Sequence, residues 1–336
     1  MRAPWLLIFL LLSCGTPEVL VRGAPCTGCR DAHGACLPGD VVSACGAAGA
    51  SCEACASTQT CRAGACVSED AGVSASADGG SDDGCAAEAR LVYVIDQDRT
   101  VSSFNPQAIG VSNAFTELGR ISCPSASGAE PFSMSVDRHA TAWIVYDSGE
   151  LFTVALRSAP LTCVKTAFSP QLGVAKFGMG FVANAPGSHD ETLFISGSDL
   201  SSTLTTTKFG TLSVTPPHAV SVLGTLGGAP ELTGTGDGKL WAFFPNLSPP
   251  KVAQLSKLDG ASLTTFEAPT LAGTPRAWAF AFWGGDFFVF LERDTELSTS
   301  VWKLDGQTGA LSSVLPSTGR RIVGAGVSTC APVEIN

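Results

Sequence analysis

Short apolar runs, separated by turn residues, recur at a regular interval from residue 85 to the end of the chain. Each run is only four to six residues long and is rich in aromatic and β-branched side chains, which is typical of strands. The runs begin at Val92, Trp143, Leu193, Leu240 and Phe287, so that successive starts lie 51, 50, 47 and 47 residues apart. This spacing predicts a repeated β unit of about 48 residues.

Two further series of runs accompany these five. One series precedes the aromatic run in four of the repeats, with starts at Phe132, Phe177, Glu231 and Trp278. The other follows it, as in "VAQLSKLDGASLTTF", where an Asp-Gly pair predicts a tight turn between two strands. Four short strands per repeat are typical of a propeller blade. A β-sandwich whose glycines mark bulges is the alternative, and the regular spacing favours the propeller.

The count of strands predicts how the ring closes. The first aromatic run, at Val92, has no strand before it, whereas the C-terminal "RIVGAGVST" has no strand after it. Pairing these two segments removes both free edges. We therefore predict an all-β fold, a five-bladed β-propeller closed by the C-terminal strand. Small residues at period two should let the innermost strands crowd around the axis. They are Gly178 and Gly180, Gly234 and Gly236, Ala279 and Ala281, and Gly324 and Gly326.

A cysteine-rich module precedes the repeats, at residues 26–66. Because it has few large apolar side chains to offset the chain entropy of folding, cross-links must hold it together. Zinc bound by its two Cys-x-x-Cys pairs is an alternative that an exported location disfavours. Eight cysteines allow 105 pairings, and the sequence does not choose among them. They are Cys26, Cys29, Cys36, Cys45, Cys52, Cys55, Cys61 and Cys66.

The remaining cysteines of the repeat region can be assigned from the blade count. In the first blade the loop between the innermost strand and its neighbour is cut, and Cys330 and Cys85 lie at the two cut ends. This predicts a Cys85–Cys330 disulfide that rejoins the hairpin. Cys123 and Cys163 then pair by elimination, between the outer strands of blades one and two. Both assignments require Cα atoms within about 7 Å of each other.

The N-terminus predicts export. "MRAPWLLIFLLLSCG" contains an apolar run that is too short to span a bilayer and is typical of a signal peptide. "LLSC" resembles the lipobox of bacterial lipoproteins, which predicts lipidation of Cys14; an ordinary cleaved signal with Cys14 incidental is the alternative. The predicted domains are a signal peptide (1–13), a tether (14–25), the disulfide module (26–66), a flexible acidic linker (67–84) and the propeller (85–336).

Composition excludes several classes of function. The net charge is −10 and no basic patch occurs, so nucleic acid is not an expected partner. No Gly-x-Ser-x-Gly, His-Glu-x-x-His or phosphate-loop motif is present. We predict no cofactor, no metal and no catalytic residue. The four histidines occur in polar, turn-like sequence and should be exposed and non-catalytic; they are His33, His139, His189 and His218.

A charged residue lies before or at the start of every innermost strand. In a propeller these positions surround one mouth of the axial channel, where charges of both signs can bind a small polar ligand or a sugar. The alternative is that they are solvated loop charges that neutralise one another. The candidate site residues are Glu130, Lys176, Glu231, Arg276 and Arg321. We expect the aromatic residues to pack between blades rather than to form a sugar platform; they are Trp143, Trp241, Phe243, Trp278, Trp283 and Phe287.

Several stretches resemble a known group of proteins: "CRDAHGACLPGD", "PFSMSVDRHATAWIVY", "ELTGTGDGKLWAFFP", "AWAFAFWGGDFFVF" and "IVGAGVSTCAP". Most of the mature chain resembles exported lipoproteins that are numerous in predatory, fruiting δ-proteobacteria. The resemblance implies an envelope lipoprotein of unknown biochemical function and supplies no catalytic residues. Gly15, which follows the lipidated cysteine, is not the aspartate of the inner-membrane retention signal, and this favours the outer membrane.

Together these patterns predict a cell-envelope lipoprotein, anchored to the membrane through lipid on Cys14, that presents a propeller as a binding or scaffold module. Its partner is expected to be a glycan, a small polar ligand or an envelope protein. One alternative is a hydrolase or lyase acting on polysaccharide in the propeller mouth. The other is a purely structural envelope protein.

Overall fold

The computed structural model describes residues 26–56, 59–62, 64–68, 83–201 and 205–335, and forms two compact units, Met1–Ala77 and Asp78–Asn336. The predicted signal peptide and tether, with Cys14, and most of the predicted linker lie outside the described residues. Within the described ranges, no helix is long and apolar enough to cross a membrane.

Four disulfides and three two-stranded antiparallel sheets build the first unit. Its strands are β1 (Cys29–Arg30), β2 (Cys36–Leu37), β3 (Asp40–Val41), β4 (Ala44–Cys45), β5 (Gln59–Arg62) and β6 (Ala65–Ser68). The bonds are Cys26–Cys36, Cys29–Cys52, Cys45–Cys61 and Cys55–Cys66. All eight cysteines of residues 26–66 are thus oxidised, which leaves none of them as the thiolate that zinc requires. Strand β6 reaches Ser68, so the first two residues of the predicted linker belong to this unit.

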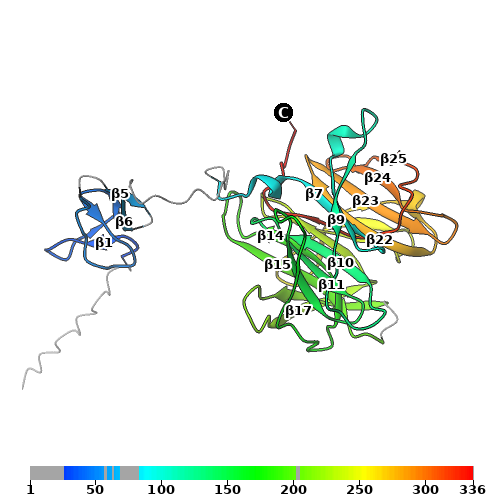
Figure 1. The fold of residues 1–336 in the computed structure, drawn as a ribbon, viewed down its shortest axis with the longest axis horizontal. Helices are drawn as coiled ribbons and strands as arrows, with labels where there is room; N and C mark the ends of the chain where they lie inside the picture. The colour runs from blue at the N-terminus through cyan, green and yellow to red at the C-terminus, as the bar shows by residue number, and fades with distance from the viewer. Residues whose placement is uncertain (1–25, 57–58, 63, 69–82, 202–204, 336) are drawn as a thin grey trace, which may run out of the picture. The chain divides into compact units, whose positions relative to one another are not determined.

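The second unit is a five-bladed β-propeller, as predicted (Figure 1). Each blade is a four-stranded antiparallel sheet whose strands follow one another from the axis outward. Blade one combines the two ends of the unit: β26 (Ile322–Val327), β7 (Val92–Asp96), β8 (Thr100–Phe104) and β9 (Phe115–Arg120). Three short 3-10 helices lie in connections: η1 (Ala87–Arg90), η2 (Pro106–Ala108) and η3 (Pro269–Leu271).

The other four blades are continuous in sequence. Blade two is β10 (Pro131–Val136), β11 (Thr141–Tyr146), β12 (Leu151–Ala155) and β13 (Cys163–Lys165). Blade three is β14 (Lys176–Ala183), β15 (Glu191–Ser198), β16 (Thr206–Leu212) and β17 (Val220–Gly227). Blade four is β18 (Glu231–Gly234), β19 (Leu240–Phe244), β20 (Lys251–Leu255) and β21 (Ser262–Glu267). Blade five is β22 (Pro275–Trp283), β23 (Asp286–Arg293), β24 (Ser300–Asp305) and β25 (Leu311–Leu315).

Strand β26 closes the ring. It pairs antiparallel with β7, with Val327 opposite Val92 and Ala325 opposite Val94. The inner strands β26, β10, β14, β18 and β22 contact one another in that circular order. The interface between blades one and five is filled by aromatic rings, with the centroid of Phe104 5.2 Å from that of Phe290. Closure therefore gives β7 a hydrogen-bonded partner and gives β22, the inner strand of blade five, a neighbour to pack against; both are β26.

The inner strands approach so closely that a side chain would not fit at several positions. A Cβ atom on Gly234 would lie 2.1 Å from the carbonyl oxygen of Phe181, and one on Gly326 would lie 2.8 Å from the carbonyl carbon of Ser135. This explains the small residues at period two. Gly236 lies in the turn after β18 rather than within the strand, but main chain approaches it as well: a Cβ there would lie 2.5 Å from the carbonyl oxygen of Thr329.

A disulfide between Cys85 and Cys330 joins the two ends of the propeller, with Cα atoms 5.9 Å apart. Both cysteines are buried. The Ser328 hydroxyl donates a hydrogen bond to the carbonyl oxygen of Ala89 (2.6 Å), which fixes the C-terminal segment against η1. The second disulfide, Cys123–Cys163, links the loop after β9 to β13, with Cα atoms 5.0 Å apart. These are the two disulfides that the sequence predicts for the propeller.

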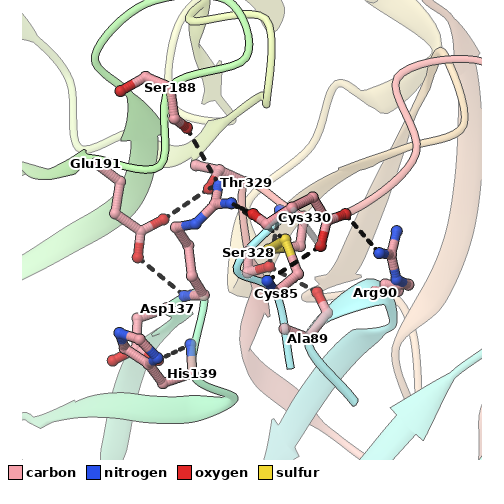
Figure 2. The surroundings of a disulfide bond; sticks show 12 residues. Cys85, Ala89, Arg90, Asp137, His139, Ser188, Glu191, Ser328, Thr329 and Cys330 are labelled. Carbon is pink, nitrogen blue, oxygen red and sulfur yellow. Dashed lines mark hydrogen bonds and ion pairs between the residues drawn. A yellow bond between two sulfur atoms is a disulfide. The ribbon is translucent and has the colours of Figure 1, made fainter. Parts of the chain in front are cut away.

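Polar contacts connect the Cys85–Cys330 disulfide to blades two and three (Figure 2). The Arg138 guanidinium donates to the Thr329 hydroxyl (3.0 Å) and to the carbonyl oxygen of Ser188 (3.3 Å). The Glu191 carboxyl accepts hydrogen bonds from the Thr329 hydroxyl (2.8 Å) and the Arg138 N–H (2.9 Å). We call Cys85, Cys330, Arg138, Glu191 and Thr329 the clasp. It holds the chain ends against two other blades.

The clasp should make stability depend on pH. Burial raises the pKa of Glu191 from 4.5 to about 7, although its hydrogen bonds act in the opposite direction. Below pH 4.5 the Glu191 carboxyl is protonated in both the folded and the unfolded state. Between pH 4.5 and 7 it ionises in the unfolded chain first, so the stability that it contributes at low pH is lost as the pH rises. We expect a decline of about 3 kcal/mol across this window that Glu191→Gln abolishes.

The measurement is urea unfolding of both proteins at pH 4.5, 5.5, 6.5 and 7.5. The difference between the two curves isolates Glu191, because every other titrating group is common to both. Parallel curves would show that Glu191 is not responsible.

Candidate functional site

The five candidate charges meet at one mouth of the propeller. A cavity of about 760 Å³ is lined by Glu130, Glu231, Arg276 and Arg321. Lys176 lines a much smaller pocket that adjoins it and also includes Glu231. The turns between the second and third strands of blades one to four reach the same cavity and add Gln97, Asp147, Thr205, Asn246 and Leu247. The loops before the inner strands and these turns therefore build one shared site.

Three bulges direct side chains into the cavity. The registers of the inner strands shift between Pro131 and Ser133, between Pro275 and Ala277, and between Ile322 and Gly324. The residue left unpaired in each bulge lines the cavity; these are Phe132, Arg276 and Val323. Bulges commonly redirect a side chain next to a binding or active site. The sequence analysis did not predict them, because no residue type marks this kind of bulge.

Glu231 is the buried acid at the inner end of the cavity, with 2% of its surface exposed. Its Oε2 accepts a hydrogen bond from the Ser133 hydroxyl (2.8 Å), and the Met179 N–H also donates to the carboxyl. Burial raises the pKa of this carboxyl well above its usual range and so favours its protonated form, which has an O–H to donate. Glu231 was predicted as a charged site residue, whereas burial disfavours its charged form.

The position of Glu231 depends on its neighbours in the ring. Ser133 belongs to blade two, whereas Glu231 belongs to blade four, so the side chain crosses blade three. It can do so because blade three presents Gly178 there; a Cβ on Gly178 would lie 3.2 Å from the Glu231 Oε2. Deeper in the ring, the Phe181 N–H donates to the Ser135 hydroxyl oxygen (3.2 Å). These contacts close the axis beneath the cavity.

Arg321 is fully engaged within the protein. Its Nη2 and Nε donate to the Glu292 carboxylate at 2.7 and 3.0 Å, and its Nη1 donates to the Gln97 Oε1 at 2.8 Å. Glu292 is buried, with 1% of its surface exposed, so Arg321 serves as its counter-ion. Glu292 was not predicted as a site residue. The feature that could have revealed it is a single acidic residue at the end of the aromatic run "FFVFLE", where a buried charge requires a partner.

Two exposed carboxylates line the cavity on blade two. The Gln97 Nε2 donates to the Glu130 Oε1 (3.1 Å), which connects this side to Arg321 through one amide. The Glu130 N–H donates to the Asp147 Oδ1 (3.0 Å), so the two residues are held next to each other. Asp147 was not predicted as a site residue, because its run "YDSGE" is also an ordinary turn sequence.

Blade five contributes a cation and an aromatic ring. Arg276 is exposed, and no carboxylate of the described residues lies within ion-pair distance of its guanidinium. Trp278 is half-buried: it packs against the apolar cluster of blades four and five and also lines the cavity. The expectation that Trp278 only packs between blades was therefore incomplete. On blade three, the Lys176 Nζ lies 5.8 Å from the centroid of the Phe132 ring.

The expectation for the histidines was wrong in one case. His33, His139 and His189 are exposed, but His218 is 4% exposed. Its Nδ1 lies 3.0 Å from the carbonyl oxygen of Ser213, and its ring packs edge-on against Trp143, with centroids 5.7 Å apart. A polar turn sequence did not reveal that this ring would fill a gap beside an aromatic residue. His218 does not line the cavity.

Comparison with known proteins identifies no family. No protein-family model matches the sequence, and no curated protein matches it. Matching solved structures include the PQQ-bound aldose sugar dehydrogenase from Streptomyces coelicolor, at 11% identity and a TM-score of 0.41, covering 70% of this chain and 81% of that chain. The exo-β-1,3-galactanase from Phanerochaete chrysosporium with galactose matches at 10% identity and a TM-score of 0.41, covering 67% and 54%.

A chain of the mitotic checkpoint complex matches at 12% identity with a TM-score of 0.36, covering 67% of this chain and 61% of that chain. The present chain thus spans about half of the galactanase and less than two thirds of the checkpoint chain. At such identities the likeness concerns the fold alone.

Proposed function

We propose that this chain is a cell-envelope lipoprotein whose propeller is a binding module, with the mouth cavity as the site for a small polar ligand. One observation carries the proposal: four of the five strand-start charges line a single cavity of about 760 Å³, together with Phe132 and Trp278. Cavities of ~300–1,000 Å³ with aromatic walls and a few convergent polar groups are typical ligand sites.

The walls of the cavity are held rigidly. Glu292 and Gln97 hold the guanidinium of Arg321, and Ser133 holds the carboxyl of Glu231. A site that is ordered before binding loses less side-chain entropy when the ligand arrives. This favours binding as the task of the cavity over a purely structural role for the propeller.

The location of the protein follows from its cysteines. Twelve cysteines form six disulfides, which indicates an oxidising compartment outside the cytoplasm. In the proposal, lipid on Cys14 anchors the chain to the outer membrane. The mass of the mature N-terminus tests this: an unmodified N-terminus that does not begin at Cys14 would refute it.

Removing the acid and the cation together should abolish binding. In Glu231→Ala/Arg276→Gln, a ligand identified by screening sugars, amino acids and short peptides should no longer raise the melting temperature. A ligand at 100 times its Kd stabilises the wild type by about 2.7 kcal/mol. Because the alanine leaves Ser133 unpaired, each shift is measured from the variant's own melting temperature, and Arg276→Gln alone is tested beside it.

The matched control is Arg120→Gln, which removes one positive charge from the exposed outer strand β9, as Arg276→Gln does from the cavity. The control should keep the full ligand-induced shift. A shift that survives in the Glu231/Arg276 variant would place the binding site elsewhere.

A second function, hydrolysis of a polysaccharide, is favoured by the two kinds of carboxyl group in the cavity. Glu231 is buried, which raises its pKa, whereas Glu130 and Asp147 are exposed. Acids in contrasting environments can act as general acid and as base or nucleophile. Release of reducing ends from a polysaccharide that binds would support this function, whereas binding without turnover would support the binding module.

A further inference from the structure

The charges that line the mouth cavity are not equivalent, because some are already neutralised. Arg321 is paired with the buried carboxylate of Glu292 through two nitrogen atoms. Glu231 is buried and accepts a hydrogen bond from Ser133, and burial raises its pKa and so disfavours its charged form. Neither residue is therefore a free charge for a ligand.

The charges that remain are separated by sign across the cavity. Glu130, just before β10, and Asp147, just after β11, are exposed carboxylates at the same end of blade two and line the cavity together. Arg276 is an exposed cation on blade five, unpaired among the residues that the structure describes. In the circular order of the inner strands, blade two lies opposite blades four and five. The negative pole and the positive pole of the cavity thus face each other across the axis.

We propose that the ligand of this cavity is a zwitterion, namely an amino acid or short peptide with a free ammonium group and a free carboxylate; this inference rests on the proposed binding function. Glu130 and Asp147 accept hydrogen bonds from the ammonium group. Arg276 binds the carboxylate, and the protonated form of Glu231, on the adjacent blade, donates its O–H to the same group.

The apolar side chains of the cavity wall suit the hydrocarbon part of such a ligand. Phe132 and Trp278 line it on blades two and five, and Leu247 lines it on blade four. These side chains can cover the hydrocarbon part of a short peptide while its ends reach the two charged poles. Ligand length is set by the distance between the poles, which a series of peptides can measure.

Other ligand classes fit the charges less well. Of the charged groups that line the cavity and are neither paired nor buried, two are carboxylates and one is a cation, so a simple anion finds no excess of positive charge there; Lys176 lines only the adjoining pocket. A neutral sugar can form hydrogen bonds with both poles through its hydroxyl groups, but it carries no charge to pair with either of them. A zwitterion pairs with both poles at once.

The experiment is isothermal titration of the mature full-length protein with alanine, dialanine, trialanine and tetra-alanine. The peptide that binds best is then compared with its N-acetyl form, which lacks the ammonium group, and with its C-terminal amide, which lacks the carboxylate. We expect each blocked form to bind at least about tenfold more weakly, as loss of one charge-assisted hydrogen bond predicts.

Variants assign each end of the peptide to one pole. Arg276→Gln should remove the preference for the free carboxylate over the amide and retain the preference for the free ammonium. Glu130→Gln/Asp147→Asn should remove the preference for the free ammonium over its N-acetyl form and retain the preference for the free carboxylate. Arg120→Gln and Glu117→Gln, on the exposed strand β9, are the matched controls and should retain both preferences.

Two results would overturn the inference in distinguishable ways. If no alanine peptide binds but a neutral oligosaccharide does, with an affinity that Arg276→Gln lowers, the cavity is a binding site and the zwitterion is wrong. If neither peptides nor sugars bind, the zwitterion and the proposed function are both wrong. Equal binding of a free peptide and its two blocked forms also overturns the inference.

Discussion

Replacing Cys85 and Cys330 together by alanine should lower the free energy of unfolding of the propeller by about 5 kcal/mol. The Cys85–Cys330 disulfide spans 245 residues, so its loss releases nearly the whole propeller chain in the unfolded state. Urea unfolding under oxidising conditions, followed by tryptophan fluorescence, measures the change.

The other propeller disulfide provides the control for this variant. Cys123–Cys163 spans only 40 residues, and replacing both of its cysteines by alanine should cost less, about 4 kcal/mol. A Cys85/Cys330 variant that unfolds at the same urea concentration as the wild type would show that the clasp does not hold the ring closed.

Deletion of residues 321–336 should have a larger effect than loss of the disulfide alone. It removes β26, whose buried Ile322, Ala325 and Val327 belong to the apolar cluster of blades one and five, and it also removes Cys330. Strand β7 is then left as an unpaired inner edge, which favours aggregation. We expect the deletion to abolish cooperative unfolding in calorimetry and to increase hydrogen exchange in Val92–Asp96.

Deletion of residues 333–336 alone is the matched control. The shortened chain ends at residue 332, beyond Cys330, and so keeps β26 and the clasp complete. It should keep a single cooperative transition. A deletion of residues 321–336 that still melts cooperatively at the wild-type temperature would refute closure by the C-terminal strand.

The fold could be predicted because it depends on features that repeat. The aromatic runs that begin near Val92 and Phe287 mark the second strand of each blade, and their spacing sets the number of blades. Gly234 and Gly326 had to be small because main chains meet there. The run at Val92 lacks an inner strand before it, and the C-terminal segment from Arg321 lacks a partner strand after it. Pairing these two segments is the one way to close the ring, and it also brings Cys85 next to Cys330.

The site was predicted only in part, because its chemistry depends on contacts between blades. Strand starts located Glu130 and Arg276, but the sequence does not show that Gly178 lets Glu231 reach Ser133 and be buried there. Nor does it show that Glu292 neutralises Arg321. These contacts join residues far apart in the chain.

The disulfide map of the module was equally beyond sequence reasoning. Its strands are mostly two residues long, so no periodic pattern places one cysteine opposite another. Cys29 bonds to Cys52, for example, although Cys36 and Cys45 lie between them in the chain. Short-range pattern cannot choose among such pairings.

The central claim is that the two ends of the propeller chain close the ring and so assemble its mouth cavity. Peptide mapping of the mature, non-reduced protein by mass spectrometry tests it most directly. Cleavage after Glu69 separates Cys66 from Cys85, and cleavage after Arg321 releases the peptide that contains Cys330. The account predicts one disulfide-linked pair that contains Cys85 and Cys330. A Cys85 bonded to any other cysteine, or present as a free thiol, would contradict it.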